Sequence, residues 1–228
     1  MDTKGDHRAA CSTAGVLQAR AVSLERMWAR VARDAGARVR THAYLRNLNL
    51  VGVSVLDDRR LEVVASGLPV AGGAQVAINA TFVAPLKRNG TARPRAHRED
   101  GAALKDAAKL KEKTYPELLA AHRCTLVTAA MEVGGRWKEE AYQLLLQFAK
   151  AKTQEASRVL RGSATHSWLR RWTTLLSKAA MDSLASTLLY GTAQNTDLWV
   201  SPDPPLGSVL AEEAHGEGPE VFRMPIGA

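Results

Sequence analysis

The chain has 228 residues, of which 46% are hydrophobic and 24% are charged. This composition is too apolar for a chain that is disordered throughout, and no run approaches the roughly 18 consecutive apolar residues that a bilayer span needs. The polar segment 1–7 argues against a secretory signal peptide, and two cysteines, Cys11 and Cys124, are too few for a disulfide framework. We therefore expect an intracellular protein with one sizeable core.

Positive charge is concentrated in the first 200 residues. Lysine and arginine number 31 against 23 acids, a net charge of +8. Residues 201–228 hold five acids and one base, so they carry −4 and the preceding residues carry +12. The positive charge of these residues favours binding of polyanions such as nucleic acid. A basic protein without such a partner is the alternative.

Hydrophobic periodicity predicts a chain of helices and strands. Residues 1–22 lack a period and are expected to form a loose lead-in. The pattern then predicts a helix over 23–36, strands over 37–44, 61–65 and 74–85, a helix over 101–121, a strand over 124–133, and helices over 138–152 and 164–189. Ser23 is the expected N-cap of the first helix, and Pro116 is expected to break the second.

This order predicts the fold class and the domain boundaries. Helix, strand, strand, strand, helix and strand, followed by two long helices, is an α/β (α+β) arrangement around a single mixed β-sheet. One domain is expected over residues 23–190. Residues 191–228 are rich in proline and acids and lack a period, so we expect a disordered tail there.

Several short segments together carry a resemblance to a known family. They are Glu62-Val63-Val64-Ala65, Gly67-Leu68-Pro69, Gly73-Ala74-Gln75-Val76-Ala77, Val83-Ala84-Pro85-Leu86, Lys111-Glu112, Thr114-Tyr115-Pro116-Glu117-Leu118 and Glu132-Val133-Gly134-Gly135-Arg136-Trp137. In this order they make the chain similar to the C-terminal, restriction-like (PD-(D/E)XK-type) endonuclease region of reverse-transcriptase open reading frames in protist non-LTR retroelements. The similarity covers about residues 5–200. Because that region follows a polymerase domain in the family, the resemblance implies an N-terminally truncated fragment.

The resemblance also implies a metal-dependent site. In the family, acids on adjacent strands hold Mg²⁺ or Mn²⁺, which activates water against a phosphodiester. Glu62 matches the first acid, Asn79 occupies the position of the second, Lys111 matches a helix lysine and Tyr115 matches the aromatic residue one turn later. Since the amide of Asn79 brings no negative charge, we expect a partial metal site at Glu62 that binds no metal here. Ordinary strand positions are the alternative for Glu62 and Asn79.

Half of a zinc-binding motif lies near the N-terminus. His7 and Cys11 resemble the end of the zinc knuckle that precedes the nuclease domain in these elements. A structural zinc ion needs four ligands. We therefore interpret the pair as a sign of truncation, with no zinc bound.

Two groups of cations are candidates for contacts with nucleic acid. They are Lys87 and Arg88 in the loop after the third strand, and Lys105, Lys109 and Lys113 on the following helix together with Arg136. Trp168 and Trp172 on the last helix could stack on bases beside Arg170 and Arg171. Their helical spacing favours packing of the two tryptophans in the core instead.

The expected function is a degenerate, inactive endonuclease-like domain of a retroelement, whose intact relatives nick target DNA with a divalent metal to prime reverse transcription. The implied partners are DNA or another polyanion and a polymerase subunit of the same element, with no membrane, and the implied location is nuclear. Two alternatives stay open: a non-catalytic nucleic-acid-binding or structural module, and an active nuclease in which Asp57, Asp58 or Glu132 replaces the missing ligand. If the ancestry is right, Glu62, Asn79 and Lys111 should converge on one cleft.

Overall fold

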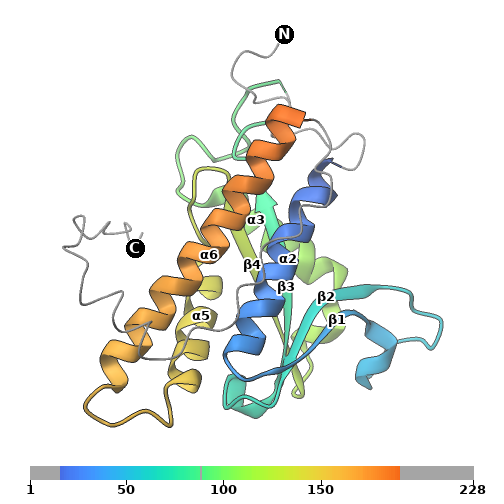
Figure 1. Ribbon diagram of the computed structural model, residues 1–228. Helices are drawn as coiled ribbons and strands as arrows, with labels where there is room; N and C mark the ends of the chain where they lie inside the picture. The colour runs from blue at the N-terminus through green and yellow to red at the C-terminus, as the bar shows by residue number, and fades with distance from the viewer. Residues whose placement is uncertain (1–15, 88, 191–228) are drawn as a thin grey trace.

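The computed structural model describes residues 16–87 and 89–190 (Figure 1). Its elements are α2 (Val16–Asp34), β1 (Arg38–Tyr44), η2 (Leu45–Leu48), β2 (Arg60–Ser66), η3 (Ala71–Gly73), β3 (Gln75–Val83), α3 (Ala102–Thr114), α4 (Pro116–Leu119), β4 (Cys124–Glu132), α5 (Glu139–Lys152) and α6 (Arg161–Tyr190). The four strands form one sheet in the order β1-β2-β3-β4. β2 is antiparallel to both β1 and β3, whereas β3 and β4 are parallel. The mixed sheet and the element order confirm the predicted fold class.

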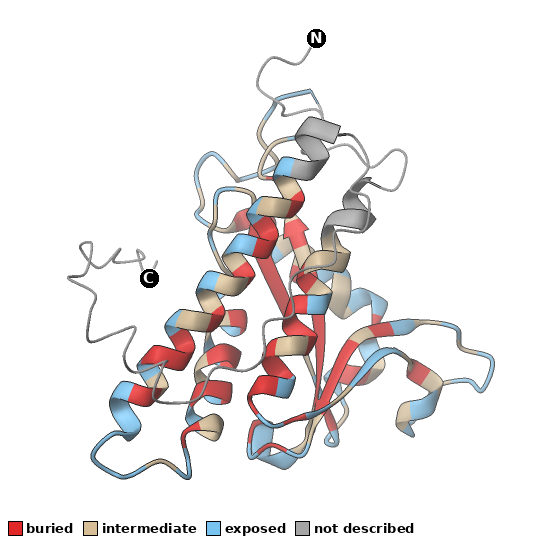
Figure 2. Cartoon of the chain, viewed as in Figure 1, coloured by how far each residue is buried: buried red, intermediate tan, exposed pale blue. Residues whose placement is uncertain are grey.

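Helices cover both faces of the sheet, and each face has its own core (Figure 2). On one face α2 and α5 pack on the sheet and α6 packs on both of these helices, and Trp28, Phe148 and Trp172 are buried in the core that they form. On the other face a smaller core joins Tyr115 and Leu118 of the α3–α4 corner to the strands. Alternate residues of β3 supply the two cores, as the period of two in its sequence predicts.

The first helix begins earlier than the sequence pattern predicts. α2 starts at Val16, so Ser23 lies inside the helix and is not its N-cap. The preceding segment 16–22 contains leucine, glutamine, arginine and two alanines, which favour helix, and an interior serine costs only a few tenths of a kcal/mol. The rest of the expected lead-in, with His7 and Cys11, and the tail 191–228 lie outside the described residues.

Proline and tryptophan behave as the sequence predicts. α3 ends at Thr114, and Pro116 opens the short helix α4, so the break falls where the ring excludes a continuous helix. On α6, Trp168 and Trp172 are 2% and 0% exposed, and their ring centroids lie 5.3 Å apart. The packing interpretation of these tryptophans is confirmed, since buried rings are not accessible to bases.

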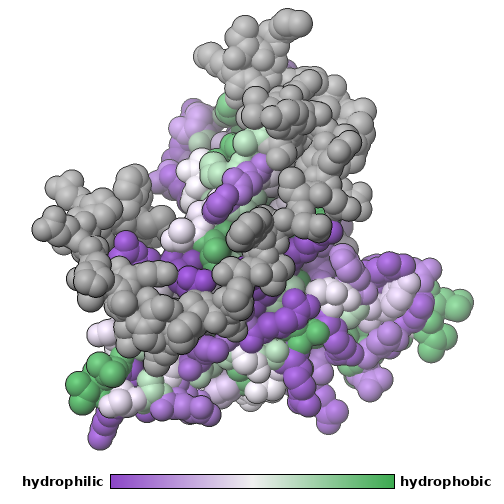
Figure 3. All heavy atoms as spheres, viewed as in Figure 1, coloured by the Kyte–Doolittle hydropathy of each residue, from purple (hydrophilic) through white to green (hydrophobic). Residues whose placement is uncertain are grey.

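The connection between β1 and β2 projects from the sheet (Figure 1). Its base is anchored by Leu45 in the smaller core, while Val51, Val55 and Leu56 are more than 80% exposed. Apolar side chains gather at the end of this projection, and a second apolar group lies at the connection between α5 and α6 (Figure 3). Within the described ranges, no helix combines the length and apolarity required to cross a bilayer.

Candidate functional site

A cleft of about 600 Å³ lies beside the point where β2 and β3 separate. The two strands are paired only from Val63–Ile78 to Ala65–Val76, whereas β3 stays paired with β4 along its whole length. Residues of α2, β1, β2, β3, the loop after β3 and α3 line the opening. Its charged or titratable residues are Glu25, His42, Arg60, Glu62, Arg93 and Lys111. The sheet thus opens where the resemblance places its first acid.

Glu62 and Lys111 meet in this cleft. The Nζ atom of Lys111 lies 3.4 Å from Oε1 of Glu62, and Oε2 of Glu62 accepts a hydrogen bond from the backbone N–H of Ala80. The side chain of Glu62 is only 17% exposed. Burial raises its pKa to about 7, against the opposing effect of Lys111. A substantial fraction of Glu62 therefore retains its proton at neutral pH.

Glu25 is a second carboxyl group of the cleft, and the sequence analysis missed it. It lies on α2, and burial raises its pKa while His42 and Lys111 oppose the shift. The charge of Glu25 also contributes to the raised pKa of Glu62, so the two carboxyl groups interact. The only indication in the sequence is the position of Glu25, which directly follows the buried Leu24 at the border of the apolar face of α2.

His42 reaches the cleft through an unusual backbone conformation. Its φ of 50° lies in the left-handed region, which is uncommon for residues other than glycine. β1 keeps its register with β2 on both sides of this position, from Thr41–Val63 to Ala43–Leu61. The faces of the two strands change at this point, because Val63 lies in the larger core whereas Leu61 lies in the smaller one.

Asn79 is not part of the cleft lining. It is 1% exposed and lies in register with Thr128 of β4, and α3 packs against both of these strands. Neither atom of its amide group has a hydrogen-bond partner among the described residues. The structure therefore brings Glu62 and Lys111 together and leaves Asn79 in the interior, so the expectation that all three residues converge on one cleft is wrong for Asn79.

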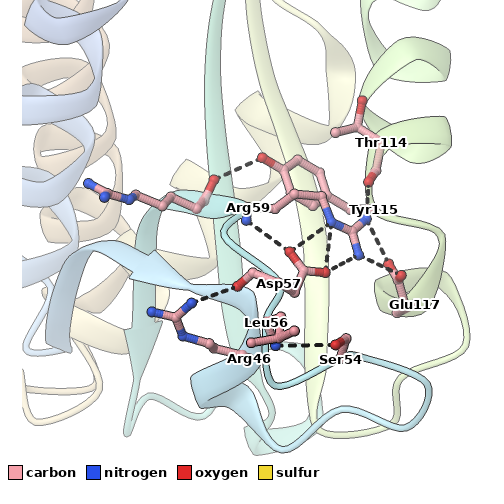
Figure 4. A network of polar contacts seen from close by, with 9 residues as sticks. Arg46, Ser54, Leu56, Asp57, Arg59, Thr114, Tyr115 and Glu117 are labelled. Carbon is pink, nitrogen blue, oxygen red and sulfur yellow. Dashed lines mark hydrogen bonds and ion pairs between the residues drawn. The ribbon is translucent and has the colours of Figure 1, made fainter.

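Tyr115 and Arg59 fix the corner from which Lys111 projects (Figure 4). The hydroxyl of Tyr115 donates a 2.8 Å hydrogen bond to the carbonyl of Arg60 at the start of β2. Arg59 forms 2.6 Å ion pairs with Asp57 and with Glu117 of α4. The contacts of Tyr115 with Arg60 and of Glu117 with Arg59 tie the α3–α4 corner to the start of β2.

The acids considered as replacement ligands lie outside the cleft lining. Asp57 is held by Arg59, and Asp58 forms a 2.6 Å ion pair with Arg46. Glu132 is 7% exposed and lies 3.8 Å from the guanidinium of Arg136. In the described part of the chain, no cluster of three or more histidine, cysteine, aspartate or glutamate side chains is arranged to hold a metal ion.

The residues of the cleft fit a divalent cation poorly. Mg²⁺ and Mn²⁺ prefer ionised carboxylates, and the affinity of a site rises with its negative charge. Glu62 and Glu25 bring two carboxyl groups to the cleft, but burial raises the pKa of both, Lys111 lies 3.4 Å from Glu62, and Asn79 contributes no oxygen to the cleft.

The cations proposed to contact nucleic acid differ in their availability. Lys105 lies 2.5 Å from Glu99, and Arg136 lies 3.0 Å from Asp100, so each has an acidic partner. Three lysines of the set are exposed and form no ion pair with the described residues: Lys87, Lys109 and Lys113. Arg88 lies outside the described residues.

A wider hollow of about 970 Å³ lies between η3, the end of α5 and the start of α6. Lys150, Arg161 and Thr165 contribute to its walls, but no acid or histidine of the described chain lines it. It therefore lacks the groups that acid–base or metal chemistry needs. The cleft beside β2 and β3 is the better candidate for function.

Comparison with known proteins does not assign the chain to a family: no protein-family model matches it, and no curated protein matches it.

Proposed function

We propose that the chain is a degenerate, restriction-endonuclease-like domain of retroelement origin that binds the phosphodiester backbone of DNA in this cleft without cleaving it. The observation that carries the proposal is the contact between Glu62 and Lys111, 3.4 Å apart in a cleft of the mixed sheet. A lysine beside an acid is the arrangement that stabilises the developing negative charge in phosphodiester hydrolysis. In this chain the pair of Glu62 and Lys111 remains as a binding site for phosphate.

Three features of the cleft support binding without cleavage. Arg60, Arg93 and Lys111 supply cations that attract phosphate groups. Glu62 is occupied by Lys111 and by the N–H of Ala80, which leaves it a weak ligand for a metal ion. Asn79 lies in the interior, so the cleft lacks a carboxylate from β3. We further propose that the domain holds no resident Mg²⁺ or Mn²⁺.

The test is binding of a fluorescently labelled DNA duplex, measured by anisotropy at pH 6 and pH 8. At pH 8 Glu62 is largely ionised and repels phosphate, so Glu62→Gln should tighten binding. At pH 6 the wild-type carboxyl group is mostly protonated, so the two proteins should bind alike. Lys111→Ala should weaken binding.

Two matched control variants test whether the changes in DNA affinity arise in the cleft. Glu155→Gln removes an exposed acid, and Lys178→Ala removes an exposed lysine of α6. Neither residue lines the cleft, so both variants should bind as the wild type does. Equal effects of the cleft substitutions and their controls would contradict binding at this site, and absence of DNA binding by the wild type would refute the proposal as a whole.

A nicking assay on supercoiled plasmid with Mg²⁺ and Mn²⁺ tests the catalytic half of the proposal. We expect no nicking by the wild type. Because Asn79 lies in the interior and outside the cleft lining, Asn79→Asp should not restore nicking either. Nicking that appears in Asn79→Asp and disappears in Asn79→Asp/Lys111→Ala would show that position 79 reaches the site and would support nuclease ancestry. Wild-type nicking that Glu62→Gln abolishes would show instead that the site is active and that our interpretation of Asn79 is wrong.

A further inference from the structure

Two arginines contact the ring of Tyr44 at the end of β1. The guanidinium carbons of Arg46 and Arg60 lie 4.2 Å and 4.4 Å from its centroid. Tyr44 and Arg60 are directly opposite each other in the antiparallel pair β1–β2, which brings their side chains together across the strands. The guanidinium of Arg60 also donates a hydrogen bond to the hydroxyl of Tyr44.

The charges of these two arginines are balanced differently. Arg46 forms a 2.6 Å ion pair with Asp58, which neutralises it. Arg60 is exposed and lines the cleft, and none of the described residues forms an ion pair with it. Arg60 therefore keeps an uncompensated positive charge at the cleft, which favours binding of an anion there.

The other cations of the cleft are committed to contacts within the protein. Lys111 lies beside Glu62, and the Nε–H group of Arg93 donates to the carbonyl of Ala84 at 2.8 Å. Among the arginines and lysines that the structure places in the cleft, Arg60 is therefore the one without a carboxylate or carbonyl partner for its side chain.

The position of Arg60 is fixed before any ligand arrives. The hydroxyl of Tyr115 donates to its carbonyl, and the preceding Arg59 is held by Asp57 and Glu117 (Figure 4). One N–H group of Arg60 donates to the hydroxyl of Tyr44, and stacking on the ring leaves the other N–H groups in the guanidinium plane able to donate to a phosphate. Less side-chain entropy is then lost when an anion binds.

We propose that Arg60, held against Tyr44, is the phosphate-binding residue of the cleft and that its ligand is a phosphodiester of a nucleic-acid strand. This inference rests on the proposed function, because it names the contact through which the cleft takes DNA. Tyr44 is a positioning residue: it holds the guanidinium without touching the ligand.

The test uses the full chain and a labelled DNA duplex, with affinity measured by anisotropy between 50 mM and 200 mM salt. Arg60→Ala should lower the affinity about tenfold at low salt and reduce the slope of log K against log salt by about one. Arg60→Lys keeps the charge but loses the planar fork, so it should keep the slope and lose part of the affinity. Arg170→Ala, which removes an exposed arginine of α6, is the matched control and should leave both unchanged.

Substitutions of Tyr44 test whether its ring positions the guanidinium of Arg60, because they leave the charge of the cleft unchanged. Tyr44→Phe keeps the ring and should bind DNA nearly as the wild type does. Tyr44→Leu removes the ring and should weaken binding while the salt slope stays the same, because the number of cations is unchanged. Thermal unfolding of each variant controls for loss of structure.

The outcomes distinguish the two proposals. If the wild type binds DNA in a salt-dependent manner and Arg60→Ala behaves like Arg170→Ala, the assignment of Arg60 fails while the proposed function stands. If the wild type binds no DNA, both fail. If Arg60→Lys and Tyr44→Leu bind as tightly as the wild type, Arg60 acts only through its net charge and the positioning role of Tyr44 is refuted.

Discussion

Replacing Glu62 by glutamine should change how the stability of the fold depends on pH. Glutamine has nearly the same shape and still accepts the hydrogen bond from the N–H of Ala80, so the main loss is the ionisable group. In the folded protein, burial raises the pKa of Glu62 from 4.5 to about 7. In the unfolded chain the carboxyl group ionises in its ordinary range. The carboxyl group is thus harder to ionise in the folded state.

The sign and size of the change in unfolding free energy follow from the difference between the folded and unfolded pKa of Glu62. Between about pH 4.5 and pH 7 the folded state binds more protons than the unfolded state, so the contribution of Glu62 to stability falls as pH rises through this window. At about 1.4 kcal/mol for each pKa unit, ionisation in the folded protein costs about 3 kcal/mol. Relative to the wild type, Glu62→Gln should therefore gain up to about 3 kcal/mol in unfolding free energy between pH 4 and pH 8.

Glu117→Gln is a control with the opposite sign. Hydrogen bonds from Arg59 lower the pKa of Glu117, so this carboxylate stabilises the fold above its unfolded pKa of 4.5 and loses that contribution as pH falls. At neutral pH Glu117→Gln should be less stable than the wild type. Below about pH 4 the difference should shrink.

Urea denaturation at one-unit intervals from pH 3 to pH 8, followed by circular dichroism, measures both differences. Comparison of each variant with the wild type at the same pH cancels the contributions of groups that do not interact with the substituted residue, such as Glu132 with its raised pKa. Parallel stability curves for the wild type and Glu62→Gln would refute the reasoning, as would a variant that becomes relatively less stable at high pH.

Two further predictions concern buried groups. Asn79→Leu replaces an interior amide that has no hydrogen-bond partner among the described residues, so it should raise the unfolding free energy by about 1 kcal/mol or more in urea. A decrease would mean that the amide is hydrogen-bonded in solution. Burial raises the pKa of Cys124 to about 11, so in a Cys11→Ser background its thiol should resist a disulfide reagent at pH 8 until denaturant unfolds the chain. Rapid labelling of the native protein would contradict this.

The sequence determined the elements whose signals are local. Alternation along β3 separated Ile78, which faces the larger core, from Ala77, which faces the smaller one. Pro116 ended α3 because its ring excludes a continuous helix. The helical spacing of Trp168 and Trp172 identified the buried face of α6. In each case the chemistry of a few neighbouring residues fixes the outcome.

Only the tertiary structure decided which side chains share the cleft. Glu25 comes from α2 and Lys111 from α3, and each approaches Glu62 because its helix packs beside the separating strands. Asn79 is adjacent to Ala80, whose N–H binds Glu62, yet it lies in the interior beside Thr128. Strand periodicity gives the face of a residue in a regular ladder, but it does not say where the ladder ends.

The same limit applies to Arg60. In the sequence it is one of four charged residues in a turn, and nothing distinguishes it from Arg59. In the fold, register with Tyr44 holds Arg60 at the cleft, while Arg59 turns toward Asp57 and Glu117. Local patterning thus determined the helices and strands, whereas strand register and helix packing, which join residues far apart in the chain, determined the composition of the site.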